Sequence, residues 1–327
     1  MKNAIQIGLL FTWYSLIASS AAFGQQIAPF TQNQFAALFN NPAYTGTQAG
    51  IHLESLFRFQ WLGINGAPLT QAVGLHLQSP NLHGGLGLQI TNDMLGAERN
   101  TGMYLSYAYR IKQRKKILSI GLQVGAMQKL LRGDLLQTPT GNYDNGTIDH
   151  NDNLLPNTTQ SGFMPDAALG VQMQTPKLLL GISVKHLLGI PLSIAGGSEK
   201  IKFSPVRHVL LNTEYKITTF AALYVIPTLL LKSDLNKIQA DVGMRLEWDN
   251  KLGAGVSLRG AEGSMESLGI MLSARLRTKW YIGYAYDLPL NLLKGQSSGS
   301  HEIGIQYFWD VAMKIKNKKI IYNPRFL

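Results

Sequence analysis

The chain has 327 residues, no cysteine, 33 glycines and only 15% charged residues, and its 30 basic and 19 acidic side chains give a formal net charge of +11. The lack of cysteine excludes a disulfide scaffold, a thiolate metal site and a cysteine nucleophile, and the 45% hydrophobic content excludes a disordered chain. A mean hydropathy of zero excludes a bundle of membrane-spanning helices but is compatible with a transmembrane β-barrel, whose lipid-facing and lumen-facing residues alternate.

Residues 1–24 have the pattern of an export signal. Lys2 provides a basic start, residues 5–18 are mostly apolar, and small residues follow at Ala22 and Gly24, which predicts cleavage before Gln25. The alternative is a buried N-terminal helix. Because an exported protein meets little genomic DNA, the basic charge is not expected to serve nucleic-acid binding.

Residues 25–50 are expected to be a lead-in or plug segment before the first strand. Residues 41–46 (Asn-Pro-Ala-Tyr-Thr-Gly) predict a turn, because proline fixes its own φ and disfavours helix at the residue before it. The preceding Phe30, Phe35 and Phe39 are apolar enough to need burial. Two interpretations remain open: the segment tucks into the periplasmic mouth or lumen of a barrel, or it simply leads into the first strand.

Residues 51–310 read as strands throughout. Between residues 51 and 61, Leu53 and Phe57 lie on an apolar face and Glu54 and Arg58 on a polar face, which is the period of a two-faced strand. Most such segments have the roughly nine to eleven residues that a tilted strand needs to cross a bilayer. Fourteen are predicted, over residues 51–61, 69–78, 84–92, 99–110, 117–131, 166–174, 178–186, 206–216, 221–232, 237–248, 252–260, 266–276, 280–287 and 300–310.

The connections between these segments alternate in length. Short connections follow the even-numbered segments, whereas the long ones, over residues 131–165, 187–205 and 288–299, follow odd-numbered segments. Outer-membrane barrels have short periplasmic turns and longer external loops. We therefore predict an all-β fold, a transmembrane antiparallel β-barrel of about 14 strands with both termini in the periplasm.

Side chains near the strand ends indicate how the barrel meets its surroundings. Aromatic residues such as Trp248 and Trp280 are expected to form interfacial girdles, with an ordinary aromatic β-core as the alternative. Asp93, Glu98 and Arg99 are expected to form an ion-paired rim around a hairpin rather than a catalytic group.

Several different short motifs follow one another along the mature chain. They are residues 39–46 (FNNPAYTG), 60–71 (QWLGINGAPLTQ), 92–102 (NDMLGAERNTG), 282–287 (IGYAYD), 298–303 (SGSHEI) and 323–326 (NPRF). Together these motifs resemble the PorP/SprF family of Bacteroidetes outer-membrane proteins, whose members serve the type IX secretion system and gliding motility.

The resemblance implies a non-enzymatic outer-membrane component that supports export or surface attachment of a secreted partner protein. The alternative is an outer-membrane transport channel, porin-like or substrate-specific. Implied partners are a secreted or surface-attached protein substrate, periplasmic secretion-machinery or peptidoglycan-associated proteins, and outer-membrane lipid. The sequence leaves open the exported substrate, the state of the lumen, the stoichiometry and the role of the 131–165 loop, including whether its Asp144, Asp149 and Asp152 bind calcium.

Basic residues concentrate at the predicted periplasmic turns and in the tail, residues 311–327. Such a face suits inner-leaflet phospholipid headgroups or an acidic periplasmic partner, although a solubilising rim explains the turns nearly as well. A barrel usually ends at its last strand, so the tail is predicted to dock a partner. The candidate partner-binding residues are Lys314, Lys316, Lys318, Lys319 and Arg325 in the tail, and Asn41, Pro42 and Tyr44 in the turn.

No catalytic, cofactor or metal site is expected. The seven histidines are scattered without metal-ligand spacing, and no nucleophile elbow or phosphate-binding loop is present. Ser300, His301 and Glu302 are adjacent, but successive strand residues point to opposite faces and cannot form a triad. An outer-membrane hydrolase with a triad assembled across strands is the third hypothesis.

Overall fold

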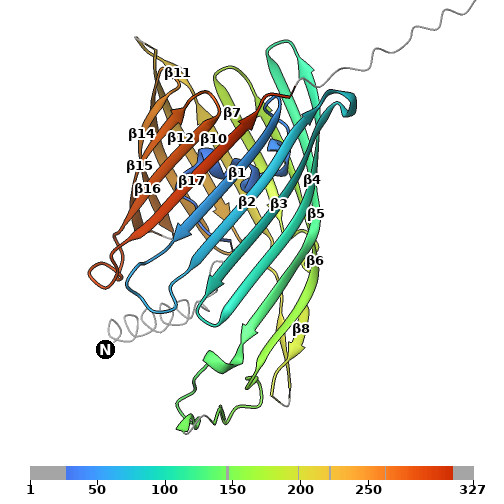
Figure 1. Cartoon of the computed structure of the whole chain (residues 1–327), viewed down its shortest axis with the longest axis vertical. Coiled ribbons are helices and arrows are strands. Elements are labelled where there is room, and N and C mark those ends of the chain that lie inside the picture. Colours follow the sequence, from blue (N-terminus) through green and yellow to red (C-terminus); the bar gives the residue numbers. More distant parts are fainter. Residues whose placement is uncertain (1–26, 145–146, 198, 221, 262, 312–327) are drawn as a thin grey trace, which may run out of the picture.

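The computed structural model describes residues 27–144, 147–197, 199–220, 222–261 and 263–311. The predicted signal peptide and the candidate basic residues of the tail lie outside these ranges. The described chain forms a closed β-barrel with strongly tilted strands and a short helical segment inside it (Figure 1).

Fourteen antiparallel strands form the barrel wall. The first and last strands pair directly, with Ile51 opposite Trp309, and this pairing and that of β10 with β12 complete the ring. A two-residue strand, β11 (Ile217–Thr218), pairs with β12 just beyond the end of β10. The wall strands are β1 (Ile51–Phe59), β2 (Leu69–Ser79), β3 (Gly84–Leu95), β4 (Glu98–Gln113), β5 (Lys116–Arg132), β6 (Thr159–Gln174), β7 (Leu178–Lys185), β10 (His208–Tyr215), β12 (Leu223–Ser233), β13 (Ile238–Trp248), β14 (Leu252–Ala261), β15 (Ser264–Leu276), β16 (Trp280–Pro289) and β17 (Ser300–Trp309).

All fourteen predicted strands are present in the predicted order, and the main differences lie in the long connections. β6 begins at Thr159 rather than at residue 166, because its polar first residues pair with the far end of β5. The sequence analysis also misses a hairpin of β8 (Leu192–Ala195) and β9 (Lys200–Phe203), whose strands pair with each other in a separate sheet.

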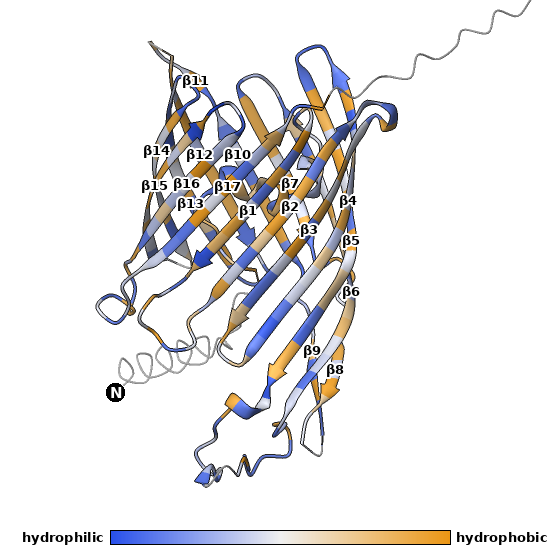
Figure 2. Ribbon diagram, in the orientation of Figure 1, coloured by the Kyte–Doolittle hydropathy of each residue, from blue (hydrophilic) through white to orange (hydrophobic). Residues whose placement is uncertain are grey.

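Polar side chains face the inside of the wall and apolar ones face the outside. On β1, Glu54 and Arg58 are buried within the barrel, whereas on β5 Leu122 and Val124 are each 49% exposed on the outer surface. Figure 2 shows the resulting alternation of hydrophobic and hydrophilic residues along the strands. This distribution is the reverse of that in a soluble protein and is the one that a lipid environment requires.

The two ends of the barrel differ in their connections. One end, which we call the turn end, carries the short connections, such as residues 114–115, 249–251 and 277–279. The other, which we call the loop end, carries the longer connections 133–158 and 186–207, and the second of these contains the β8–β9 hairpin. The longest connections therefore lie at the loop end, as the sequence predicts, although this end also has short turns such as residues 96–97.

Helices are few among the described residues. The α-helix α2 (Asn33–Asn40) and the 3₁₀ helix η1 (Pro42–Tyr44) precede β1, and two more 3₁₀ turns, η2 (Pro80–Leu82) and η3 (Gly133–Leu135), lie in connections. None of the helices in this part of the chain is both long and apolar enough to cross a membrane.

Candidate functional site

The chain before β1 runs through the interior of the barrel. We call residues Ile27–Gly46 the luminal segment. Ile27 lines a cavity at the loop end together with Trp61, whereas the backbone N–H of Gly46 donates to Nδ1 of His76, near the turn end, at 3.2 Å. The segment therefore spans the lumen lengthwise, and Figure 1 shows its helical part surrounded by the strands.

Five buried charged side chains from five strands meet at the start of this segment. We call them the anchor cluster: Arg58 (β1), Asp241 (β13), Arg259 (β14), Asp287 (β16) and Glu302 (β17). Arg58 donates to Asp287 at 2.6 Å and to Glu302 at 3.0 Å. Arg259 donates to Asp241 at 2.6 Å and to Asp287 at 3.4 Å. The cluster ties together strands from both sides of the point where β1 and β17 close the barrel.

The anchor cluster also holds residues 30–32, which lead directly into helix α2. The Glu302 carboxylate accepts the backbone N–H groups of Thr31 and Gln32, each at 2.9 Å. The Thr31 hydroxyl donates to Asp287, and Arg259 donates to the carbonyl of Phe30 at 3.1 Å. Since the amino end of a helix has unpaired N–H groups and a partial positive charge, a carboxylate at this position is favourable.

Side chains on the opposite wall satisfy the carboxyl end of the same helix. The ammonium of Lys185 donates to the carbonyl of Phe39 at 2.9 Å, and the Ser183 hydroxyl donates to that of Asn40 at 2.6 Å. Gln89 donates to the carbonyl of Leu38 at 3.0 Å. The wall thus supplies a carboxylate at one end of α2 and a cation at the other, which complements the helix dipole in both places.

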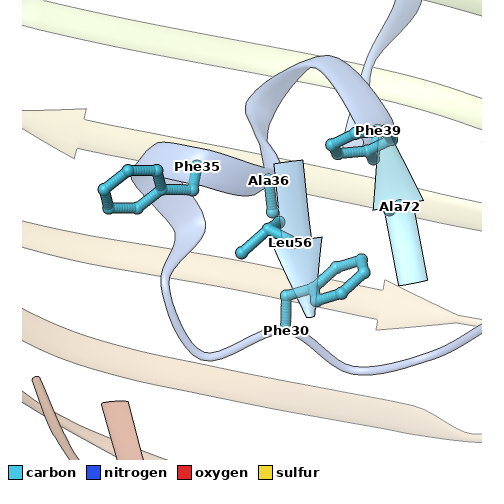
Figure 3. Close-up of a cluster of buried hydrophobic side chains, with 6 residues drawn as sticks. All are labelled: Phe30, Phe35, Ala36, Phe39, Leu56 and Ala72. Atoms are coloured by element: carbon cyan, nitrogen blue, oxygen red, sulfur yellow. The ribbon is translucent and has the colours of Figure 1, made fainter. Parts of the chain in front are cut away.

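Apolar contacts fill the space between the two polar ends. Figure 3 shows the buried cluster of Phe30, Phe35, Ala36 and Phe39 from the luminal segment against Leu56 of β1 and Ala72 of β2. The Phe35 ring stacks on Tyr281 with centroids 4.8 Å apart. A Cβ at Gly304 would lie 2.7 Å from the Phe35 ring, so this glycine makes room for the ring.

The predicted turn after the helix is present as η1 and packs against the wall. Asn41 accepts the N–H of Ala43 at 2.9 Å and donates to the carbonyl of Val171 on β6 at 3.2 Å. A Cβ at Gly121 of β5 would overlap the backbone of Pro42 and Ala43. The wall therefore closely matches the shape of this turn.

The candidate partner-binding residues differ in what the structure shows of them. Asn41, Pro42 and Tyr44 are buried inside the barrel, and their described contacts are made within the chain. Lys314, Lys316, Lys318, Lys319 and Arg325 lie outside the described residues. Partner binding by either group stays a prediction.

Cavities lie on both sides of helix α2. At the loop end, cavities of about 580 and 370 Å³ share Ile27 and Ala28 among their lining residues. At the turn end, a cavity of about 210 Å³ is lined by Gln34 and Tyr44 of the luminal segment. The luminal segment therefore lies between vestibules that open towards opposite ends of the barrel.

Two sequence expectations concern charged and chelating groups. The predicted rim of Asp93, Glu98 and Arg99 is wrong: Glu98 pairs with Lys129 at 2.6 Å, Arg99 donates to Asn92 and Asp93 accepts from Thr70. The register of the strands, not proximity in sequence, selects these partners.

In the loop-end turn after β12, the backbone N–H groups of residues 237 and 236 hold the pKa of Asp234 below its usual value. The described residues contain no group of three histidine or acidic side chains placed to hold a metal.

Sequence reasoning missed the anchor cluster. It placed Arg58 on the polar face of its strand, but the partners Asp287 and Glu302 are 229 and 244 residues away along the chain. One signal was available: charged residues on the lumen-facing parity of membrane strands need partners in the interior. Ser300 and Glu302 point inward and His301 points outward, as the alternation predicts.

Comparisons with known proteins place the chain among membrane barrels. Residues 22–307 match the family described as type IX secretion system membrane protein PorP/SprF. No curated protein matches this sequence. Among solved structures, the toluene transporter TbuX of Ralstonia pickettii has a TM-score of 0.55 at 13% identity, over 84% of this chain and 93% of TbuX. CymD, a monoaromatic hydrocarbon channel, has a TM-score of 0.50 at 14% identity, over 88% and 95%. At these identities the likeness shows a common barrel fold alone.

Proposed function

The chain belongs to the type IX secretion system membrane protein family PorP/SprF, and we propose that it is a non-enzymatic outer-membrane component of that machinery. In this proposal it supports export or surface attachment of a secreted partner protein. Its turn end faces the periplasm and its loop end faces the exterior, in keeping with the lengths of the connections.

The observation that carries the proposal is the occupied lumen. A 14-strand barrel is wide enough for an internal passage unless something fills it. Here the chain's own luminal segment is held at both ends of its helix, by Glu302 on one wall and by Lys185 on another. A barrel built around its own segment suits a component that binds partners better than it suits a pore for free diffusion.

Co-purification tests this proposal directly. The detergent-solubilised chain would be affinity-purified from its native membrane, and the proteins that accompany it identified by mass spectrometry. We expect periplasmic secretion components or a large secreted protein to accompany the chain. Recovery of the barrel without any partner, together with normal secretion in a strain lacking the chain, would rule out the machine-component function.

We further propose that the basic tail docks the periplasmic partner. The matched variants each remove four positive charges: a tail set, in which Lys314, Lys316, Lys318 and Lys319 become Gln, and a turn set, in which Lys112, Arg114, Lys115 and Lys116 become Gln. The tail set is expected to lose the partner while the barrel still assembles, since acidic surfaces are attracted by clustered cations. Equal recovery of the partner with both sets would exclude docking by the tail.

A transport channel is the second candidate, and the vestibules at the two ends favour it. TbuX is a toluene transporter, and CymD is a monoaromatic hydrocarbon channel. A channel would require the luminal segment to leave room for a solute. Uptake of small solutes by liposomes that contain the purified chain, at a rate above protein-free liposomes, would support this candidate.

A further inference from the structure

The outer wall carries an apolar cavity close to the turn end. It has a volume of about 640 Å³, and its lining includes Leu246, Trp248, Leu276, Ile282 and Tyr284 from strands β13, β15 and β16. Its volume falls within the range of small-molecule sites. The cavity opens on the lipid-facing surface and is separate from the lumen and from the luminal segment.

The strand register explains why the wall is hollow here. Ala254 of β14 lies between Leu246 of β13 and Leu272 of β15. Ala274 of β15 lies between Leu252 of β14 and Ile282 of β16. The two small alanine side chains thus form the bottom of the cavity, and large side chains surround them. Several of these large side chains are more than 40% exposed, such as Trp248 at 58% and Leu272 at 60%.

Basic residues lie in the turns next to the cavity: Arg277 directly follows the lining residue Leu276, and Lys251 directly precedes the lining residue Leu252. The turns at residues 249–251 and 277–279 join the strands that line it, and they present Lys251, Arg277 and Lys279 to solvent. Lys251 pairs with Asp249 at 2.6 Å. Within the described ranges Arg277 and Lys279 form no ion pair. Two cations are therefore available at the edge of an apolar depression.

We propose that this cavity is a binding site for an anionic phospholipid of the turn-end leaflet. One acyl chain occupies the depression over Ala254 and Ala274, and the phosphate pairs with Arg277 and Lys279. A peptide is a poorer occupant, because the lining offers mainly apolar side chains and a backbone buried in it would lack hydrogen-bond partners. The site is independent of the proposed secretion function.

Quenching of the fluorescence of Trp248 by a bound lipid tests the proposal, because this tryptophan lines the cavity. The mature chain with Trp61, Trp280 and Trp309 replaced by Phe would be delipidated in detergent. It would then be titrated with phosphatidylglycerol or phosphatidylcholine carrying brominated acyl chains. We expect phosphatidylglycerol to quench Trp248 at a roughly 25-fold lower concentration, since each of the two basic groups near the anionic headgroup contributes about fivefold.

Three variants separate a site from general lipid contact. Arg277→Gln with Lys279→Gln is expected to abolish the preference for phosphatidylglycerol, whereas Lys115→Gln with Lys116→Gln, at a distant basic turn, leaves it unchanged. Ala274→Leu fills the floor and is expected to weaken quenching by both lipids.

Native mass spectrometry of the chain with all its mature tryptophans provides a second measurement that does not depend on the Phe substitutions. It is expected to show one retained phosphatidylglycerol, lost in the Arg277 and Lys279 variant and kept in the Lys115 and Lys116 variant. Equal quenching by the two lipids, or equal effects of the two pairs of Gln substitutions, would show annular lipid only and overturn the proposal. Protection of Trp248 from both lipids by a second copy or another protein would overturn it as well.

Discussion

Arg58 and Glu302 are the side chains that fix the start of the luminal segment. Arg58 contacts Asp287, Glu302 and the Thr31 hydroxyl, and its side chain is 2% exposed. Burying charges carries a desolvation penalty that their pairing must offset, and removal of one partner leaves the other charge uncompensated. The cluster is therefore expected to specify the position of the segment strictly.

Glu302→Ala tests this dependence. The variant leaves Arg58 with one carboxylate and leaves two backbone N–H groups at the helix start without an acceptor. We expect the free energy of unfolding to fall by about 3 kcal/mol, measured by urea titration of the refolded barrel. Asp249→Ala breaks the exposed pair with Lys251 and is expected to change it by less than about 1 kcal/mol. Equal losses in the two variants would contradict a special role for Glu302.

A designed disulfide tests the position of the other end of the segment. The hydroxyls of Thr45 and Ser106 lie 2.9 Å apart, and the natural chain has no cysteine. Thr45→Cys with Ser106→Cys is therefore expected to cross-link on oxidation, as seen by mass spectrometry of a digest. Thr45→Cys with Leu105→Cys, whose second side chain is 60% exposed on the outer face, should stay reduced. Cross-linking of the control pair alone would place Thr45 outside the barrel.

At the scale of elements, the strands were predictable and their partners inside the lumen were not. Alternation identifies each strand because the lipid-facing parity must be apolar in every one of them. The same rule fails for the β8–β9 hairpin, which lies outside the wall sheet and so carries no such constraint. It also fails at residues 159–165 of β6, which extend the wall beyond the predicted start of the strand.

The luminal segment was predictable in part. Its apolar residues and its proline indicated burial and a turn, and both are present in the structure. The helix-end partners were not predictable, because Glu302 and Lys185 reach the segment only when the sheet closes into a ring. A single sequence does not give the register of the strands, so it does not reveal which inward-facing charged side chain contacts which backbone group of the segment.

Gly121→Val tests the fit between β5 and the turn at Pro42. Valine favours strands, so the strand itself should tolerate the change, but the new side chain would overlap the backbone of the turn. We expect an overpacking cost of about 1–3 kcal/mol and a marked drop in the yield of the Thr45–Ser106 cross-link. Ala126→Val, on the outward face of the same strand, should leave the yield unchanged. An unchanged yield in both variants would contradict close packing of the turn.

At the scale of the whole molecule, the two ends of the described chain, residues 27 and 311, lie at different ends of the barrel. β1 begins and β17 ends together at the turn end, as the even strand number predicts. The luminal segment then carries the chain back through the lumen, so that Ile27 lies at the loop end. A partner at the loop end and a partner at the turn end would thus meet different parts of the protein.

Cysteine labelling tests the proposed orientation of the barrel. Leu292→Cys places a thiol in a loop-end connection, where residue 292 is 96% exposed, and Thr278→Cys places one in a turn-end connection. A membrane-impermeant maleimide applied to intact cells is expected to label position 292, and to label position 278 only after the outer membrane is permeabilised. The reverse pattern would invert the orientation and place the loop end in the periplasm.

Planar-bilayer conductance tests the central claim, that the barrel is closed by its own luminal segment. We expect the purified chain to insert without steady current, because helix α2 and its anchors lie between the two vestibules. Gly121→Val is expected to conduct in bursts as the segment is displaced. A steady open conductance of the unaltered chain, no different from that of Gly121→Val, would contradict the account and identify the protein as a channel.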